Sequence, residues 1–167
     1  MKRFRVLVAD PPWRFADALG RRGAAAHYPT LSIWQLCDFP LPPLGRNAVL
    51  FLWRVGAMQE EALQLCRAWG FEPKSEIVWE KTTTRGNPHF GLGRIVRWSH
   101  ESCIIATRGR PKVRAKNVRS RFSAPVGRHS QKPETFFDLV ERLYDGPYAE
   151  LFARRRRPGW ACYGNEV

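Results

Sequence analysis

The chain has 167 residues, 44% of them hydrophobic and 13% aromatic, and its 28 lysines and arginines against 15 acidic residues give a formal net charge of +13. This length fits one domain with a packed core, and no apolar run approaches the roughly 20 residues that a membrane-spanning helix needs. The basic head at residues 2–5 precedes an apolar stretch too short for a signal peptide, so we expect a cytoplasmic protein.

Apolar strands alternate with helices along the chain. The first strand must end at Asp10-Pro11-Pro12-Trp13, because two prolines cannot continue a β-ladder. Gly70 follows an amphipathic segment and predicts the end of a helix, whereas Pro133 suits the first turn of another. The predicted elements are strands over 3–9, 47–53, 76–80, 100–107, 148–153 and 160–167, and helices over 31–36, 59–69 and 132–144.

This alternation predicts an α/β fold, with a mostly parallel sheet in a single domain that spans 1–167. Three connecting loops, 14–30, 81–99 and 108–129, are longer than loops usually are unless they serve a function, and we expect them to be flexible. Ligands of such sheets lie beyond the carboxyl ends of the strands. The first two loops begin just past strand ends, so they are expected to rim a shared cleft.

The positive charge is concentrated in the third loop. No acidic residue lies between Glu101 and Glu134, and we interpret 110–127 as a basic stretch without regular structure. A surface that is basic only for solubility would carry its charge evenly, so this stretch predicts contact with an anionic partner, by default nucleic acid. The residues expected to make that contact are Arg114, Lys116, Arg119 and Arg121.

Cysteine and histidine spacing does not indicate a metal site. The four cysteines are isolated, no Cys-x-x-Cys pair occurs, and the four histidines have no ligand spacing. We therefore expect free thiols, and we expect neither a disulfide framework nor a bound metal.

Asp10-Pro11-Pro12-Trp13 at a strand end has a specific chemical use. The exocyclic amine of adenine is a poor nucleophile, because its lone pair is delocalised into the ring. A carboxylate and a backbone carbonyl that each accept one N–H would hold this nitrogen nearer tetrahedral geometry. The prolines supply a rigid turn with carbonyls free to accept, and Trp13 offers a face to the base. The same residues also fit a plain strand end with a helix-capping aspartate.

Seven further motifs follow this tetrapeptide along the chain. The set of motifs and the order in which they occur resemble those of the adenine-N6 methyltransferases related to the catalytic subunit of the eukaryotic mRNA adenosine methyltransferase, in their compact prokaryotic or phage form. The resemblance covers about residue 5 to 167. The segments that carry it are Asp10–Trp13, Leu50–Trp53, Ile77–Thr82, His100–Cys103, Ser130–Pro133, Glu150–Arg154, Gly159–Trp160 and Gly164–Glu166.

The resemblance implies a circularly permuted Rossmann-like fold that uses S-adenosylmethionine, with the catalytic strand first and the cofactor strands last. It places catalysis on Asp10, Pro11, Pro12 and Trp13. It assigns the cofactor, released as S-adenosylhomocysteine, to Asp10, Ser130, Lys132, Glu150, Phe152, Arg154, Asn165 and Glu166. The residues near the target base would be Trp13, Tyr28, Lys81 and His100.

Some of these residues also fit structural roles. They are Lys132 as a solvated helix-start lysine, Glu166 as a terminal charge, Tyr28 as a loop anchor and His100 as a strand-end histidine.

The function expected from the resemblance is methyl transfer to the N6 amine of adenine in nucleic acid, with DNA favoured over RNA. One alternative is a catalytically silent paralogue that binds nucleic acid and supports a partner methyltransferase subunit, although the intact Asp10 argues against it. A second is a cytosine-N4 enzyme, in which a serine would usually replace Asp10. No separate target-recognition domain fits in this length, so specificity would come from the loops or from a homodimer or second subunit.

Overall fold

The computed structural model describes residues 3–14, 30–93, 95–127, 131–164 and 167. Its helices are α1 (Ile33–Cys37), α2 (Gln59–Ala68) and α3 (Glu134–Leu143). Its strands are β1 (Phe4–Ala9), β2 (Leu44–Arg54), β3 (Glu72–Thr82), β4 (His100–Arg108), β5 (Arg121–Pro125), β6 (Tyr148–Leu151) and β7 (Trp160–Tyr163).

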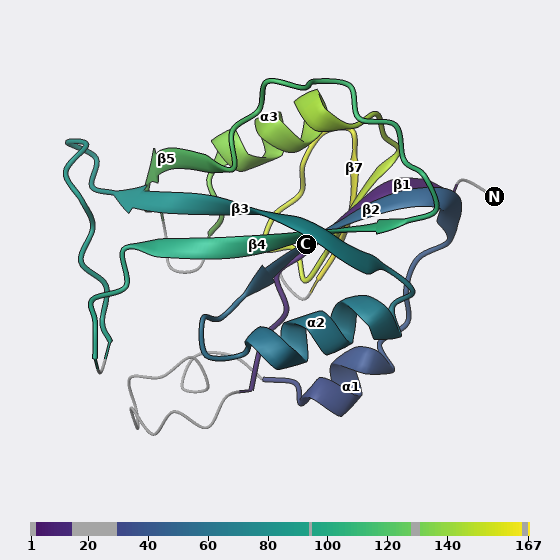
Figure 1. Cartoon of the computed structure of the whole chain (residues 1–167), viewed down its shortest axis with the longest axis horizontal. Coiled ribbons are helices and arrows are strands. Elements are labelled where there is room, and N and C mark those ends of the chain that lie inside the picture. Colours follow the sequence, from purple (N-terminus) through teal and green to yellow (C-terminus); the bar gives the residue numbers. More distant parts are fainter. Residues whose placement is uncertain (1–2, 15–29, 94, 128–130, 165–166) are drawn as a thin grey trace.

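These strands form a single sheet in the order β5-β3-β4-β2-β1-β6-β7 (Figure 1). Strand β4 runs antiparallel to both of its neighbours, β2 and β3, whereas the other neighbouring strands pair in parallel. The fold is therefore mixed α/β with a mostly parallel sheet, as the sequence predicts. The carboxyl ends of the parallel strands and the start of β4 consequently lie on one side of the sheet, which we name the carboxyl edge.

Both faces of the sheet are covered, which explains why its central strands are apolar throughout. Along β1, Leu7 and Ala9 pack on the face covered by α1 and α2, whereas Val6 and Val8 pack on the face covered by α3 (Figure 1). Two hydrophobic layers thus hold β1 rigidly. The residue that follows it, Asp10, is positioned at the carboxyl edge by this packing.

The helix ends follow local rules that the sequence shows. Ser32 caps α1 through a capping box with Gln35, and Gly70 adopts a φ of +79° directly after α2, a conformation that favours glycine. Pro133 is the N-cap of α3, which begins at Glu134 rather than at residue 132. Most predicted elements are therefore present, with boundaries that differ by a few residues.

The expectation of a structureless basic stretch over 110–127 is wrong in one part, because Arg121–Pro125 forms β5. Ala124 is buried there, Phe122 is partly buried, and the indole Nε1 of Trp79 donates to the Ala124 carbonyl over 2.9 Å. Only two apolar positions mark this strand, and basic residues and a proline surround them. Its pairing with β3, which is distant in sequence, stabilises it.

The remaining expectations concern thiols, metals and loops. The four cysteines are free, and the described part of the chain holds no cluster of candidate metal ligands and no helix long enough to cross a membrane. The predicted loop over 14–30 falls almost wholly outside the described residues.

Candidate active site

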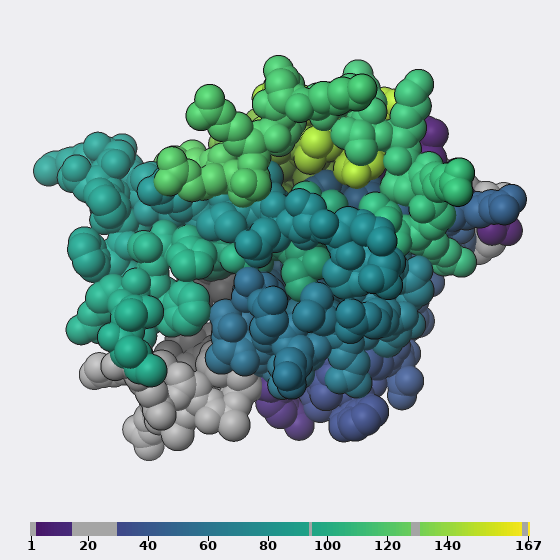
Figure 2. All heavy atoms as spheres, viewed as in Figure 1, coloured from purple at the N-terminus to yellow at the C-terminus, as the bar shows by residue number. Residues whose placement is uncertain are grey.

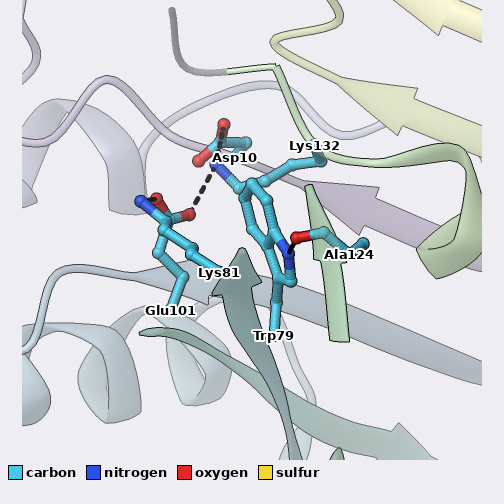
Figure 3. A network of polar contacts seen from close by, with 6 residues as sticks. All are labelled: Asp10, Trp79, Lys81, Glu101, Ala124 and Lys132. Atoms are coloured by element: carbon cyan, nitrogen blue, oxygen red, sulfur yellow. Dashed lines mark hydrogen bonds and ion pairs between the residues drawn. The ribbon is translucent and has the colours of Figure 1, made fainter. Parts of the chain in front are cut away.

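A buried lysine joins two carboxylates at the carboxyl edge. Asp10 follows β1, Glu101 lies at the start of β4, and Lys132 precedes α3. The Lys132 Nζ lies 2.6 Å from Asp10 Oδ2 and 3.1 Å from Glu101 Oε2 (Figure 3). Side chains from three separate parts of the chain therefore meet at one ammonium group.

Lys81, at the end of β3, extends this group. Its Nζ lies 2.5 Å from Glu101 Oε1, on the opposite oxygen from Lys132 (Figure 3). Each ammonium also lies over an indole ring, with Lys132 5.1 Å from the Trp53 centroid and Lys81 5.2 Å from that of Trp79. We name these four side chains, Asp10, Lys132, Glu101 and Lys81, the charge network. Negative and positive groups alternate along it, so each charge has a partner of opposite sign.

The pKa values of this network follow from its pairing. Burial favours the neutral form of Glu101, but the charges of Lys132 and Lys81 outweigh it and lower the pKa of this carboxyl to about 2. Burial likewise acts against the charge of Lys132, yet Asp10 and Glu101 raise the pKa of its ammonium above the usual value. At neutral pH Glu101 is an anion and Lys132 a cation.

The turn after Asp10 is built by backbone hydrogen bonds. The N–H of Trp13 donates to the Pro11 carbonyl, and the N–H of Leu31 donates to the Pro12 carbonyl, each over 2.8 Å. The expectation that these carbonyls are free is therefore wrong, because both already accept a backbone N–H. A carbonyl oxygen has two lone pairs, so each can still accept a second donor.

The Trp13 side chain is buried in the core, and its Nε1 donates to the Trp53 carbonyl over 3.1 Å. Trp13 therefore anchors the turn to β2, and its place beside a base remains a prediction.

Three residues predicted to bind the cofactor, Glu150, Phe152 and Arg154, lie in or just past β6, the neighbour of β1. Burial raises the pKa of Glu150 to about 7, against the nearby positive charge of Arg157. Phe152 has a φ of 60°, a strained value for a residue with a side chain. The centroid of its ring lies 4.7 Å from the centroid of the Phe39 ring. Its ring thus has a packing role, and cofactor binding by Phe152 remains a prediction.

A second group of polar side chains lines a cavity next to β7. Arg157 ion-pairs with Glu134, and its guanidinium lies 3.6 Å above the Phe137 ring. Its Nε and Nη2 are buried without a hydrogen-bond partner among the described residues. The cavity measures about 330 Å³ and is lined by Arg156, Arg157, Trp160, Cys162 and Val167. Buried donors of this kind fit a ligand that carries oxygen acceptors.

The residues predicted to contact substrate lie in two regions, one at the carboxyl edge and one in the third loop. At the carboxyl edge, Lys81 contacts Glu101, and the exposed His100 lies one residue before Glu101. The centroid of the His100 ring is 5.8 Å from that of Trp98. The basic residues of the third loop begin at the opposite edge of the sheet, where β4 ends, and the chain then crosses over α3 to β5 (Figure 1).

Among these basic residues, Arg114 is tied to the protein itself. It forms an ion pair of 3.0 Å with Asp145, and its backbone N–H donates to the Leu143 carbonyl.

Glu101 is the residue that the sequence interpretation misses. It occurs in the His100–Cys103 motif, but a glutamate at a strand start is most often a solvated charge, and only tertiary structure pairs it with two lysines. The predicted site residues Tyr28, Ser130, Asn165 and Glu166 lie outside the described part of the chain.

Comparison with known proteins agrees with the resemblance. The sequence model of the MT-A70 family matches residues 4–166. The chain is 29% identical to the type II methyltransferase M.MunI of a Mycoplasma species, with 99% of this chain and 78% of that protein aligned. It is 30% identical to the human N(6)-adenosine-methyltransferase catalytic subunit METTL3 and to the MT-A70-like N(6)-adenosine-methyltransferase of Arabidopsis thaliana. These alignments cover 99% and 98% of this chain but only 28% and 24% of those relatives.

Proposed function

The chain belongs to the MT-A70 family, and on this premise we propose that it transfers a methyl group from S-adenosylmethionine to the N6 amine of adenine in nucleic acid. The observation that carries the proposal is the carboxylate of Asp10, held 2.6 Å from the buried Lys132 at the carboxyl edge. A packed strand, a rigid proline turn and an ion pair fix this carboxylate before any substrate binds. Such preorganisation is the feature that electrostatic catalysis requires.

In the proposed step, Asp10 accepts one N–H of the target amine and a proline carbonyl of the turn accepts the other. These two acceptors localise the nitrogen lone pair, so that it points away from the plane of the base. When bound, the cofactor would supply a methyl group on a positively charged sulfur, and the C–S bond would break as the N–C bond forms, so that the sulfur leaves as a neutral thioether. The methylated amine would then give up one N–H proton to the Asp10 carboxylate, from which it passes to solvent. Lys132 keeps the Asp10 carboxylate oriented and is itself held by Glu101.

Three described residues, Asp10, Lys132 and Arg157, are suited to contacts with the cofactor. Its methionine end carries a carboxylate and an ammonium, which Lys132 and Asp10 are suited to bind. Its ribose hydroxyls need partners with both donors and acceptors, a role that we propose for Asn165 and Glu166. The buried donors of Arg157 can donate to ribose oxygens of the cofactor, whereas the resemblance assigns Arg154 to the cofactor. We further propose that the fold is circularly permuted, with the catalytic Asp10 after β1 and the cofactor residues near β6 and β7.

For the substrate we propose DNA rather than RNA, because one relative that aligns with this chain over 78% of its own length is the type II methyltransferase M.MunI, a DNA methyltransferase. The net charge of +13 is suited to either polyanion.

The test of the proposed function is Asp10→Asn, which keeps the shape of the side chain and removes its charge. The rate at which tritium passes from labelled S-adenosylmethionine to DNA should fall about a hundredfold or more in this variant. Nucleoside analysis of the DNA treated with the parent protein should identify the product as N6-methyladenine. Asp138→Asn, on the exposed side of α3, is the matched control and should retain full activity. Comparable rates for Asp10→Asn and the parent would refute the catalytic assignment. Binding without transfer by the parent would favour the silent paralogue.

A further inference from the structure

Exposed apolar side chains are concentrated in one segment next to the candidate site. Of the eight large hydrophobic side chains that are exposed in the described residues, five lie between 90 and 98, in the connection from β3 to β4. Four of them, which we name the apolar rim, are exposed by 75% at Phe90, 69% at Leu92, 96% at Ile95 and 62% at Val96. Apolar groups gathered in this way on a surface usually mark an interaction site.

The segment that carries the rim has a defined structure. Its two sides are joined by a hydrogen bond of 2.9 Å from the Gly91 N–H to the Trp98 carbonyl. The Trp98 ring packs so closely on Gly56, just past β2, that a Cβ at this glycine would overlap it. Trp98 thus anchors the segment against the sheet, and the rim residues lie on its outer side. In Figures 1 and 2 the segment projects from the body of the molecule.

The base of this segment is part of the candidate active site. The backbone N–H of Lys81 donates to the Ser99 carbonyl over 2.8 Å, and that of His89 donates to the Lys81 carbonyl over 3.0 Å. Lys81 in turn contacts Glu101, which shares Lys132 with Asp10. The segment that carries the rim therefore starts and ends beside the network that holds Asp10, and we place the neighbours of a bound nucleotide along this segment.

The charge around the rim indicates the kind of partner. No acidic residue lies between Glu80 and Glu101, whereas this interval contains Arg85, Arg94 and Arg97. The segment that carries the rim is thus basic in sequence as well as apolar, a composition that is complementary to bases attached to a phosphate backbone. Proteins that unstack bases commonly combine apolar side chains with arginines in this way.

We infer that the apolar rim contacts the bases that flank the target adenine and replaces the stacking that they lose when the adenine enters the site. This inference rests on the proposed function and adds a second, non-electrostatic surface for the nucleic acid. An adenine in a duplex must leave the helix to reach Asp10, and its former neighbours then need new apolar contacts. The rim supplies such contacts without any sequence-specific hydrogen bond.

The test replaces the four rim residues together by serine, as Phe90→Ser, Leu92→Ser, Ile95→Ser and Val96→Ser. All four are exposed, so the melting temperature should remain close to that of the parent protein. Trp34→Ser, which removes an apolar side chain exposed by 72% on α1, is the matched control. Fluorescence anisotropy with a labelled DNA duplex and with its single strand measures binding between about 50 and 200 mM salt.

We expect the quadruple variant to bind both DNA probes about tenfold more weakly, because the removal of one side chain on which a base stacks has an effect of this size. The slope of log Kd against log salt should stay unchanged, since no cationic side chain is replaced. Affinity for S-adenosylhomocysteine, measured by titration calorimetry, should also be unchanged. The control variant should match the parent in all three measurements.

Binding by the quadruple variant that equals the parent's would overturn the inference. If sedimentation then showed that the substitutions convert a dimer to a monomer, the rim would be a contact between copies of the chain. These outcomes are distinct from failure of the proposed function. A parent protein that binds DNA but methylates none would refute the activity, whereas the binding comparison would still decide the role of the rim.

Discussion

Replacement of Glu101 by glutamine tests whether the charge network stabilises the fold. Glutamine keeps the size of the side chain and one acceptor oxygen, but it cannot carry the charge that faces Lys132 and Lys81. Lys132 would retain Asp10 as its partner, 2.6 Å away, so its ammonium would not be left alone. The variant therefore isolates the contribution of one carboxylate.

The size of the effect follows from the pKa of Glu101. The pairing with two lysines lowers this pKa from 4.5 to about 2, despite the burial that opposes it. Each pH unit between these values corresponds to about 1.4 kcal/mol, so the charged form contributes about 3 kcal/mol to the free energy of unfolding. A lowered pKa in the folded state means that the contribution is complete above pH 4.5. It is lost as the pH falls from there towards 2.

The assay is urea unfolding of the parent and of Glu101→Gln at a series of pH values. The difference in unfolding free energy between them should be about 3 kcal/mol at pH 7 and should shrink steadily below pH 4.5. Glu72→Gln, at an exposed position at the start of β3, is the control and should show no such dependence. A difference near zero at pH 7, or one that does not change with pH, would refute the reasoning.

Two further predictions concern other charged groups. Burial raises the pKa of Glu150 to about 7, so the parent should lose stability as the pH rises from about 4.5 to 7. Glu150→Gln should remove this loss, and equal changes in Tm between pH 5 and pH 8 for the two proteins would contradict it. Joint replacement of Lys116, Arg119 and Arg121 by glutamine should reduce the salt slope of DNA binding by about one for each phosphate that these side chains neutralise. Arg114→Gln should leave the slope nearly unchanged, because Arg114 already pairs with Asp145. An unchanged slope in the triple variant would show that the basic stretch does not bind DNA.

Much of the architecture could be predicted from the sequence, because it depends on local patterns. The apolar run of β2 predicts a strand buried on both faces, and Gly70 predicts the end of α2. Asp10-Pro11-Pro12-Trp13 identifies both the end of β1 and the chemistry expected there. The order of the motifs indicates the family, which the match over residues 4–166 confirms.

Tertiary structure decided the features that depend on contacts between distant segments. Strand β5 exists because Phe122 and Ala124 pack beside β3, which no local pattern around them reveals. The sequence likewise shows Trp13 as an available aromatic face, whereas the core buries its ring and uses its N–H to hold the turn.

Glu101 gives the clearest example of this division. By itself a glutamate at a strand start has no assigned role, and its charge is normally solvated. Only the sheet order, which places β4 between β2 and β3, brings it to Lys81 and Lys132. The sequence therefore determined which candidate groups the chain offers and where they lie along it. The fold determined which of them are paired, because pairing depends on distances between residues that are far apart in the chain.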